Sequence, residues 1–422
     1  MQYFRTRFFD AGLKDEKGFH HTLRALGSRN YRLFFMGQSV SLIGLWIQRI
    51  ALSWLVYRIT LSPLSLGFVD FIGQIPVFCL TLFTGVWLDR SDLRNVLIVT
   101  QWLAVAQALL LAALTLSGFV SYWHIVFLSA FLGVVNSFDM PARQAYVIQL
   151  VERKEDLGNA IALNSSLFNG ARLIGPSIAG IAIAAVGEGF CFLFNGISFL
   201  GTIAALRSIK TPLKETPTAS RKGVSGVLEG IEYAFGSRVI RELLMLLALL
   251  SLIGLPYLVL LPVFAREVLG GGPQTLGYLM ASSGVGALGG TFFLASRKGT
   301  GALPGIIARA TALFGLSLSA FAVSATPWLS FLLISVAGFG MVLAISACNT
   351  LLQTLVDDHM RARVMSLYVM SLIGIGPLGS LMAGAAAHFA GVPVTFFIGG
   401  LICAAGGWRF ERKALIRKDL KA

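Results

Sequence analysis

The sequence predicts an all-α integral membrane protein with twelve transmembrane helices arranged in two pseudo-symmetric halves of six. Three observations predict this fold: the scarcity of charged residues, a series of apolar runs long enough to cross a bilayer, and a repeat between the halves of the chain. Charged residues make up only 13% of the 422 residues, and the mean hydropathy is +0.77. Soluble domains carry about 25% charged residues. Most of this protein's surface must therefore face lipid, which argues against a soluble enzyme.

Twelve apolar runs have about the 20 residues that a helix needs to span a bilayer. In the first half of the chain they are Leu33–Ile59, Leu64–Leu88, Val96–Ser117, Trp123–Met140, Ala160–Val186 and Phe190–Leu206. In the second half they are Leu243–Phe264, Leu276–Ser296, Ile306–Ser324, Trp328–Leu352, Val364–Phe389 and Val392–Trp408. Because the number is even, we expect both termini on the same side of the membrane.

The positive charge of the chain, +14 at pH 7, is concentrated in three segments. Lysine and arginine cluster before the first run, between the sixth and seventh runs, and in the tail. The alternate loops hold only Arg58 and Arg266. Lys and Arg in short loops favour the cytoplasmic side, so we expect both termini to be cytoplasmic, in a bacterial inner membrane. The charge is then a topology signal, and we expect no nucleic-acid partner.

A long connection with two prolines divides the chain, and an internal repeat supports the division. Gln149–Glu152 before the fifth run is similar to Thr354–Asp357 before the eleventh, about half a chain apart. We expect these segments: a cytoplasmic amino-terminal segment (1–32), six spans (33–206), a cytoplasmic linker with an amphipathic stretch (207–242), six spans (243–408) and a basic cytoplasmic tail (409–422). Two such halves place a substrate site at their interface near the middle of the membrane.

The four cysteines lie within apolar runs and lack metal-ligand spacing: Cys79, Cys191, Cys348 and Cys403. We expect buried thiols, with neither disulfides nor a zinc site. The sequence contains no phosphate-binding loop of the G-x-x-x-x-G-K-[ST] type. Direct use of ATP is therefore not expected.

Few ionisable residues lie inside the runs, where each costs about 2.5 to 3.5 kcal/mol on insertion scales. Arg49 precedes the end of the first run and Asp70 follows the start of the second, so both lie at a similar depth and can pair. At about 100° per residue, polar residues share a side of each helix, which predicts a cavity lining: Gln38, Gln48 and Arg49 on the first span, Asp70 and Gln74 on the second.

Two roles are open for Asp70. It forms a permanent ion pair with Arg49 that fixes two helices, or it exchanges a proton for substrate as access alternates. Arg172 in the fifth run shares a face with Asn169. Anion binding and helix packing are both open for Arg172.

Several motifs resemble the major facilitator superfamily. The loop after the second run, Gly85-Val-Trp-Leu-Asp89-Arg90-Ser-Asp-Leu-Arg94, is similar to its G-x-x-x-D-R-x-x-x-R signature. Gly175–Gly180 resembles the G-P-x-x-[GA]-G motif of its antiporters, and Phe138–Ala145 and Asn159–Ser165 are similar to its enterobactin-exporter-like branch, the transmembrane secretion effectors. The resemblance implies the major facilitator fold and secondary active transport.

The loop signature predicts a cytoplasmic gate made of Gly85, Asp89, Arg90, Arg94 and Asp139. Glycine permits a close helix approach, an aspartate can face a positive helix amino terminus, and the arginines can pair with Asp139, the nearest acid. In the resembling family such a cluster locks the outward-facing state. The alternative is that these charges only anchor the loop in the headgroup layer.

Two glycine–proline pairs are expected to kink helices and tighten an interface, with an influence on leak: Gly175-Pro176 in the fifth run and Gly376-Pro377 in the eleventh.

With Asp139 in the gate, the cavity holds Arg49 and Arg172 against Asp70, a net charge of +1. We therefore predict a monomeric exporter, coupled to protons and embedded in the lipid bilayer, for a small amphiphilic neutral, zwitterionic or anionic metabolite, siderophore-like or drug-like. We expect no enzymatic activity, no cofactor and no metal, with the proton gradient as the energy source. The alternatives are a multidrug cation/proton antiporter, a lysolipid flippase, a passive receptor or scramblase, and a membrane-embedded enzyme.

Overall fold

The computed structural model describes residues 24–88, 90–151, 154–209, 224–297 and 299–415. Within these ranges the regular structure is helical, and 11 helices are long and apolar enough to cross a membrane. The fifth expected span corresponds to α6 (Leu157–Val186), of which the uninterrupted described apolar stretch is Ile174–Val186. The all-helical membrane fold predicted from the sequence is confirmed.

The first half of the chain contains six long helices joined by short connections. They are α2 (Arg29–Thr60), α3 (Pro63–Leu88), α4 (Leu93–Leu116), α5 (Tyr122–Leu150), α6 (Leu157–Val186) and α7 (Glu188–Ser208). Two short 3-10 turns precede α2 and α6: η1 (Arg24–Gly27) and η2 (Lys154–Asp156). We call α2–α7 the N-terminal half.

In the second half, π-helical turns interrupt two of the spans. The seventh span consists of α9 (Arg238–Leu249), η3 (Leu250–Gly254), α10 (Tyr257–Val263) and η4 (Phe264–Val268). Three continuous spans follow: α11 (Pro273–Ala295), α12 (Leu303–Ala322) and α13 (Pro327–Leu355). The eleventh span consists of α14 (Asp358–Val369), η5 (Met370–Gly374) and α15 (Gly376–Ala390), and the twelfth is α16 (Val392–Leu415). We call α9–α16 the C-terminal half.

The two glycine–proline pairs have different local structures. The eleventh span changes from the π-turn η5 to α15 at Gly376-Pro377, where proline occupies the first turn of the new helix. Proline is tolerated there because the first N–H groups of a helix have no intrahelical acceptor. By contrast, α6 continues as α-helix through Gly175-Pro176.

The amphipathic stretch of the linker lies within α8 (Val224–Gly236), which rests on α14. Arg363 of α14 forms an ion pair of 2.7 Å with Glu229. The hydroxyl of Tyr233 donates to a carboxylate oxygen of Asp357 at 3.1 Å, just before α14 begins. These contacts tie the connection between the halves to the eleventh span.

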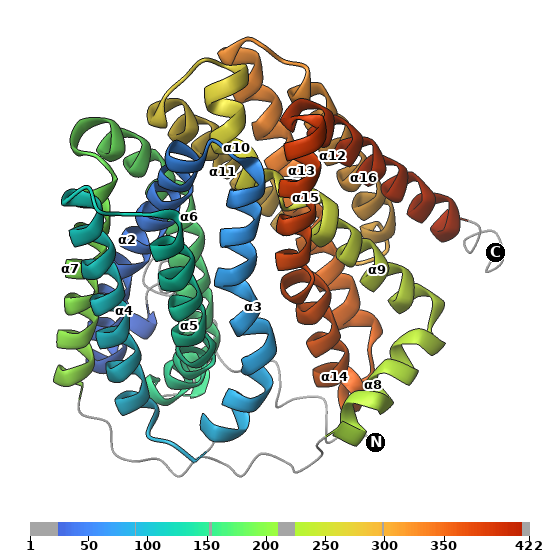
Figure 1. Ribbon diagram of the computed structural model, residues 1–422. Coiled ribbons are helices and arrows are strands. Elements are labelled where there is room, and N and C mark those ends of the chain that lie inside the picture. The colour runs from blue at the N-terminus through green and yellow to red at the C-terminus, as the bar shows by residue number, and fades with distance from the viewer. Residues whose placement is uncertain (1–23, 89, 152–153, 210–223, 298, 416–422) are drawn as a thin grey trace.

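The halves pack internally and meet along two helix pairs. Within the N-terminal half, α2 packs on α6 and α7, α4 on α5 and α7, and α3 on α5. Within the C-terminal half, α12 packs on α13 and α16, and α11 on α13. Between the halves, α3 lies against α15 and α6 against α11. Figure 1 shows the N-terminal half on the left and the C-terminal half on the right.

Both inter-half helix pairs cross at glycines. We call the two ends of the bundle the Arg29 end and the Thr60 end, after the first and last residues of α2. Toward the Thr60 end, a Cβ on Gly67 of α3 would lie 2.3 Å from the carbonyl oxygen of Ser380 on α15. A Cβ on Gly180 of α6 would lie 2.8 Å from the Cα of Gly277 on α11. At both crossings the backbones touch, so a side chain at either position requires the halves to move.

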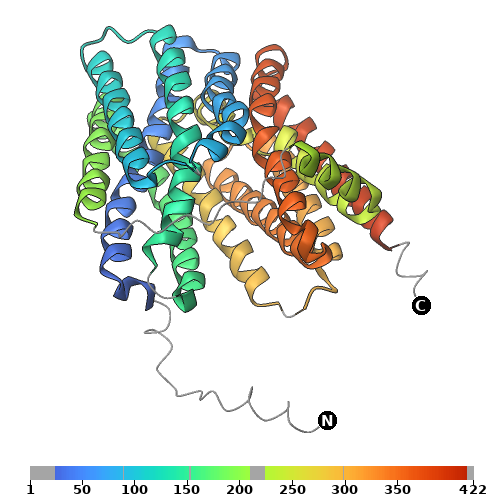
Figure 2. The same cartoon turned by 90° about the horizontal axis from the view of Figure 1, so that it is seen from below.

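Among the described residues, the buried apolar cluster that joins the two halves lies toward the Thr60 end. One core cluster there combines residues of both halves, among them Trp54 and Tyr57 of α2, Phe264 of η4 and Leu276 of α11. Toward the Arg29 end the core divides into separate clusters. One includes Tyr31, Phe34 and Tyr146 of the N-terminal half, and another includes Leu243, Leu303 and Leu352 of the C-terminal half. Seen from below, the two halves occupy separate sides (Figure 2).

The expectation of four buried thiols is wrong for one cysteine. Cys191, Cys348 and Cys403 are buried, but Cys79 is exposed. Cys79 lies on α3, a helix at the junction of the halves whose apolar window is only 22% buried. A helix at this junction has partners on fewer sides than one inside a half.

Replacing Gly67 by alanine is expected to lower the melting temperature of the detergent-purified protein, because the new methyl group would push α15 away from α3. Gly201 on α7 provides the matched control, since a Cβ there has no heavy atom within 4 Å. Alanine is favoured over glycine inside a helix by about 1 kcal/mol, so Gly201→Ala should melt at or slightly above the wild-type temperature. A Gly67→Ala protein that behaves like Gly201→Ala would contradict the close crossing.

Candidate functional site

Asp70 on α3 is surrounded by donors from three helices. Its Oδ1 lies 3.4 Å from Nη2 of Arg49 on α2, which confirms the predicted pairing. Its Oδ2 accepts hydrogen bonds from Nε2 of Gln74, one turn along α3, at 2.5 Å and from Oγ of Ser380 on α15 at 2.6 Å. We call Arg49, Asp70, Gln74 and Ser380 the Asp70 cluster. Because Ser380 belongs to the C-terminal half, the cluster joins the two halves.

Arg49 is held loosely, although its partner is nearly covered. Its side chain is 56% exposed, against 17% for that of Asp70. A guanidinium has five N–H donors, and among the described residues only Asp70 accepts a hydrogen bond from it. The ring of Trp46 lies beside it, with its centroid 5.6 Å from Cζ. The remaining donors of Arg49 are therefore available to an anionic or hydrogen-bond-accepting group.

The glycine–proline motif of α6 packs against the helix that carries Arg49. A Cβ on Gly175 would lie 2.5 Å from the Cβ of Trp46, so α6 presses on α2 one turn before Arg49. On the next turn, Gly180 meets Gly277 of α11. Through this motif, α6 packs closely against α2 on one side and against α11 of the C-terminal half on the other. Arg172 and Asn169 lie on the same helix, but their side chains are outside the part of the chain that the structure describes.

Two predicted cavity residues instead pack inside the N-terminal half. Gln38 and Gln48 are only 1% and 2% exposed. Nε2 of Gln48 donates to Gln107 of α4 at 3.1 Å, and Asn195 of α7 donates to Oε1 of Gln48 at 2.8 Å. The expectation that Gln38 and Gln48 line a cavity is therefore wrong. Polar side chains also join helices within a membrane bundle, and a polar stripe alone does not separate the two uses.

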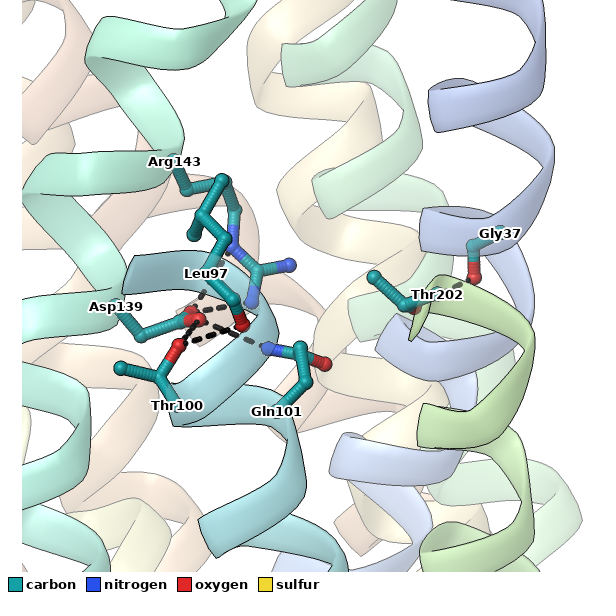
Figure 3. A network of polar contacts seen from close by, with 7 residues as sticks. All are labelled: Gly37, Leu97, Thr100, Gln101, Asp139, Arg143 and Thr202. Atoms are coloured by element: carbon teal, nitrogen blue, oxygen red, sulfur yellow. Dashed lines mark hydrogen bonds and ion pairs between the residues drawn. The ribbon is translucent and has the colours of Figure 1, made fainter. Parts of the chain in front are cut away.

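Asp139 forms a second buried cluster toward the Arg29 end (Figure 3). Its side chain is 7% exposed, and Oδ1 accepts hydrogen bonds from Thr100 at 2.9 Å and Gln101 at 2.8 Å, both on α4. Oδ2 accepts from Nε of Arg143, one turn along α5, at 3.0 Å. Arg143 was missed by the sequence reasoning, although its spacing of four residues from Asp139 is the signal for a helical ion pair.

The pairing predicted between Asp139 and the loop arginines is wrong. Arg94 binds the end of α7 instead of Asp139: its Nε and Nη2 donate to the carbonyl oxygens of Leu206 and Arg207, both at 2.8 Å. These are carbonyls of the last turn of α7, which lack intrahelical donors and attract cations. Arg90 is exposed.

Two members of the predicted gate, Asp89 and the side-chain surroundings of Gly85, lie outside the described residues.

Replacing Arg143 by methionine should lower the melting temperature, because it leaves the Asp139 carboxylate buried without its cation. Breaking a buried pair in this way costs about 3 to 5 kcal/mol. The exposed Arg90→Met is the matched control and should change little. A double variant, Asp139→Asn with Arg143→Met, should recover part of the loss. Equal melting of Arg143→Met and Arg90→Met would show that the buried Asp139 carboxylate does not depend on the Arg143 cation.

The chain matches the family of transmembrane secretion effectors over residues 21–421. Among its relatives, the staphyloferrin A transporter of Staphylococcus aureus is 27% identical, covering 91% of this chain and 96% of the relative. The multidrug efflux pump Tap of Mycobacterium tuberculosis is 28% identical, covering 82% and 84%.

Solved transporters share the fold. A bacterial homologue of the human lysosomal transporter Spinster, in an inward-facing and unoccupied conformation, has a TM-score of 0.70 at 13% identity, covering 91% of this chain and 97% of the homologue. A bacterial homologue of the iron transporter ferroportin, in an inward-facing state, has a TM-score of 0.69 at 18% identity, covering 91% and 98%. From the family match and this fold, the chain belongs to the transmembrane secretion effector family of major facilitator transporters.

Proposed function

We propose that this transporter is a proton-coupled exporter of a small amphiphilic metabolite, neutral, zwitterionic or anionic, that works by alternating access. The observation that carries the proposal is the Asp70 cluster: a half-exposed arginine with spare donors beside a carboxylate, at the junction of the two halves. Major facilitator halves bind substrate between them. The protein is proposed to act as a monomer, with protons and the substrate as its ligands and without a cofactor.

The distribution of basic residues supports an orientation. Lys and Arg favour the cytoplasmic side of short loops. Among the described residues, the Arg29 end carries Arg207 and Arg238, which flank the linker, and Arg409 and Arg412 near the end of α16. With that end in the cytoplasm of a bacterial inner membrane, closure at the Thr60 end is closure toward the outside. The conformation described above is then inward-facing, the state in which an exporter loads its cargo.

The chemistry of the cluster narrows the cargo. An exchanger requires that proton and substrate compete, and a substrate that uses only Arg49 would not compete with a proton on Asp70. The substrate must therefore also donate to the ionised carboxylate. A molecule with an ammonium or hydroxyl donor near a carboxylate or other acceptor meets both conditions, because its donor faces Asp70 and its acceptor faces Arg49. The similarity to the staphyloferrin A transporter supports a siderophore-like cargo of this kind.

Ligand binding can be tested by thermal unfolding of the purified protein with iron-chelating catecholates, carboxylate chelators, lysolipids and lipophilic cations. A ligand at 100 times its dissociation constant should stabilise by about 2.7 kcal/mol. Stabilisation by an anionic or zwitterionic ligand should be lost in Arg49→Ala. It should persist in Arg58→Ala, because Arg58 is also on α2 but pairs with Glu188 at 2.8 Å, away from the cluster. Stabilisation by cations alone would favour the multidrug cation/proton antiporter instead.

Proton coupling can be tested in proteoliposomes with a ligand identified in this way. Asp70→Asn should abolish transport driven by an imposed pH gradient, because asparagine cannot release a proton. Binding should weaken but persist, because the amide oxygen still accepts a hydrogen bond from the substrate and Arg49 is unchanged. Glu232→Gln, an exposed acid on α8, is the matched control and should transport normally. Gradient-driven transport by Asp70→Asn would show that another group carries the proton.

A further inference from the structure

The hydrogen bond between Ser380 and Asp70 is the polar contact of the cluster that crosses from one half to the other. Ser380 is only 4% exposed, and its hydroxyl donates to Oδ2 of Asp70 at 2.6 Å. The carbonyl oxygen of the same residue is the atom that a Cβ on Gly67 would meet. The donor therefore lies at the glycine crossing. Any separation of α15 from α3 would lengthen its hydrogen bond to Asp70.

We infer that Ser380 transmits the charge state of Asp70 to the closure of the Thr60 end. This inference rests on the proposed proton coupling at Asp70. A hydrogen bond to an ionised acceptor is about twice as strong as one between neutral groups. When a proton binds Asp70, Ser380 and Arg49 both lose their charged partner, and α15 is held less firmly against α3. Protonation therefore favours opening at the Thr60 end.

This contact would keep the transporter closed at the Thr60 end when neither a proton nor a substrate is bound; we call it the lock. With Asp70 ionised and no substrate bound, Ser380 and Gln74 both donate to Oδ2, and the Thr60 end stays shut. A proton on the carboxylate releases this lock. A substrate donor that takes the place of the serine hydroxyl on Oδ2 releases it as well. Only the loaded carrier then changes state, which prevents the empty transporter from returning and dissipating the proton gradient.

Among the described residues, the other titratable groups near the Thr60 end form no bond with Asp70, and Glu188 pairs with Arg58 instead. Nδ1 of His124 on α5 lies 3.0 Å from the hydroxyl of Ser121, and His388 on α15 is exposed. Glu267 of η4 accepts a hydrogen bond from the hydroxyl of Tyr57 on α2. This second bond also joins the halves but does not touch Asp70. It therefore provides a matched control for the role of Ser380.

The closure can be measured as a distance between spin labels at the Thr60 end. Phe119, which is 77% exposed between α4 and α5, and Val323, which is 72% exposed after α12, place one label in each half. Cys79 is replaced by serine in this background because it is the exposed native thiol among the four cysteines. Distances are recorded without ligand at acidic and at alkaline pH, in the full-length protein.

The wild-type protein should shift toward the longer, open distance at acidic pH. Ser380→Ala should move the ratio of closed to open molecules about tenfold toward open at alkaline pH, and should lose most of its response to pH. Tyr57→Phe should also favour the open state, but it should retain the response. Asp70→Asn should resemble Ser380→Ala, with the same distances at both pH values.

The outcomes separate this inference from the proposed function. A Ser380→Ala protein that responds to pH as the wild type does would overturn the role of Ser380, even if Asp70 drives transport. Loss of the response in Tyr57→Phe, with retention in Ser380→Ala, would also overturn it and assign the response to Glu267. Proton-driven transport in Asp70→Asn proteoliposomes would instead contradict the proposed coupling itself. A melting temperature of Ser380→Ala close to that of the wild type shows that the variant is folded.

Discussion

Direct backbone contact at two glycine crossings is the constraint on which the rest of the structure depends. In a bilayer the hydrophobic effect does not drive helices together, so close packing and polar contacts must do so. Gly67 against α15 and the Gly180–Gly277 contact bring the halves together at the Thr60 end. Only at that separation can Ser380 reach the carboxylate of Asp70. The glycines thus determine both the closed end and the geometry of the proposed site.

Polar side chains serve two different purposes in this fold. Inside the N-terminal half, Gln48 and Asp139 are buried and bonded to neighbouring helices, which makes that half a rigid unit. At the junction of the halves, Arg49 is half-exposed and holds Asp70 by one contact, and Ser380 of the other half donates to the same carboxylate. Firm bonds within a half and replaceable bonds between halves suit a transporter that moves its halves as rigid bodies, because the replaceable ones are those that a ligand can take over.

The C-terminal half brings fewer charges but a less regular backbone. The π-turns η3 and η5 face each other, and the hydroxyl of Ser251 in η3 donates to the carbonyl oxygen of Leu372 in η5 at 2.7 Å. Interrupted backbone is tolerated within a membrane protein where neighbouring helices satisfy its polar groups. Because η5 immediately precedes α15, the helix that carries Ser380 begins at a structural break.

The sequence by itself determined the membrane spans, the family and the Arg49–Asp70 pair. Bilayer thickness and the high cost of a buried charge act on each segment separately. Their effects, apolar runs of spanning length and few ionisable residues within them, can therefore be recognised in the sequence. The partners of Asp70 and Asp139 were decided by the tertiary structure. Ser380 is one serine among many, and Gln48 lies next to Arg49 in the same polar stripe of the first span. Which of them faces the other half depends on how each helix is rotated about its axis, and neighbouring helices set that rotation through close packing.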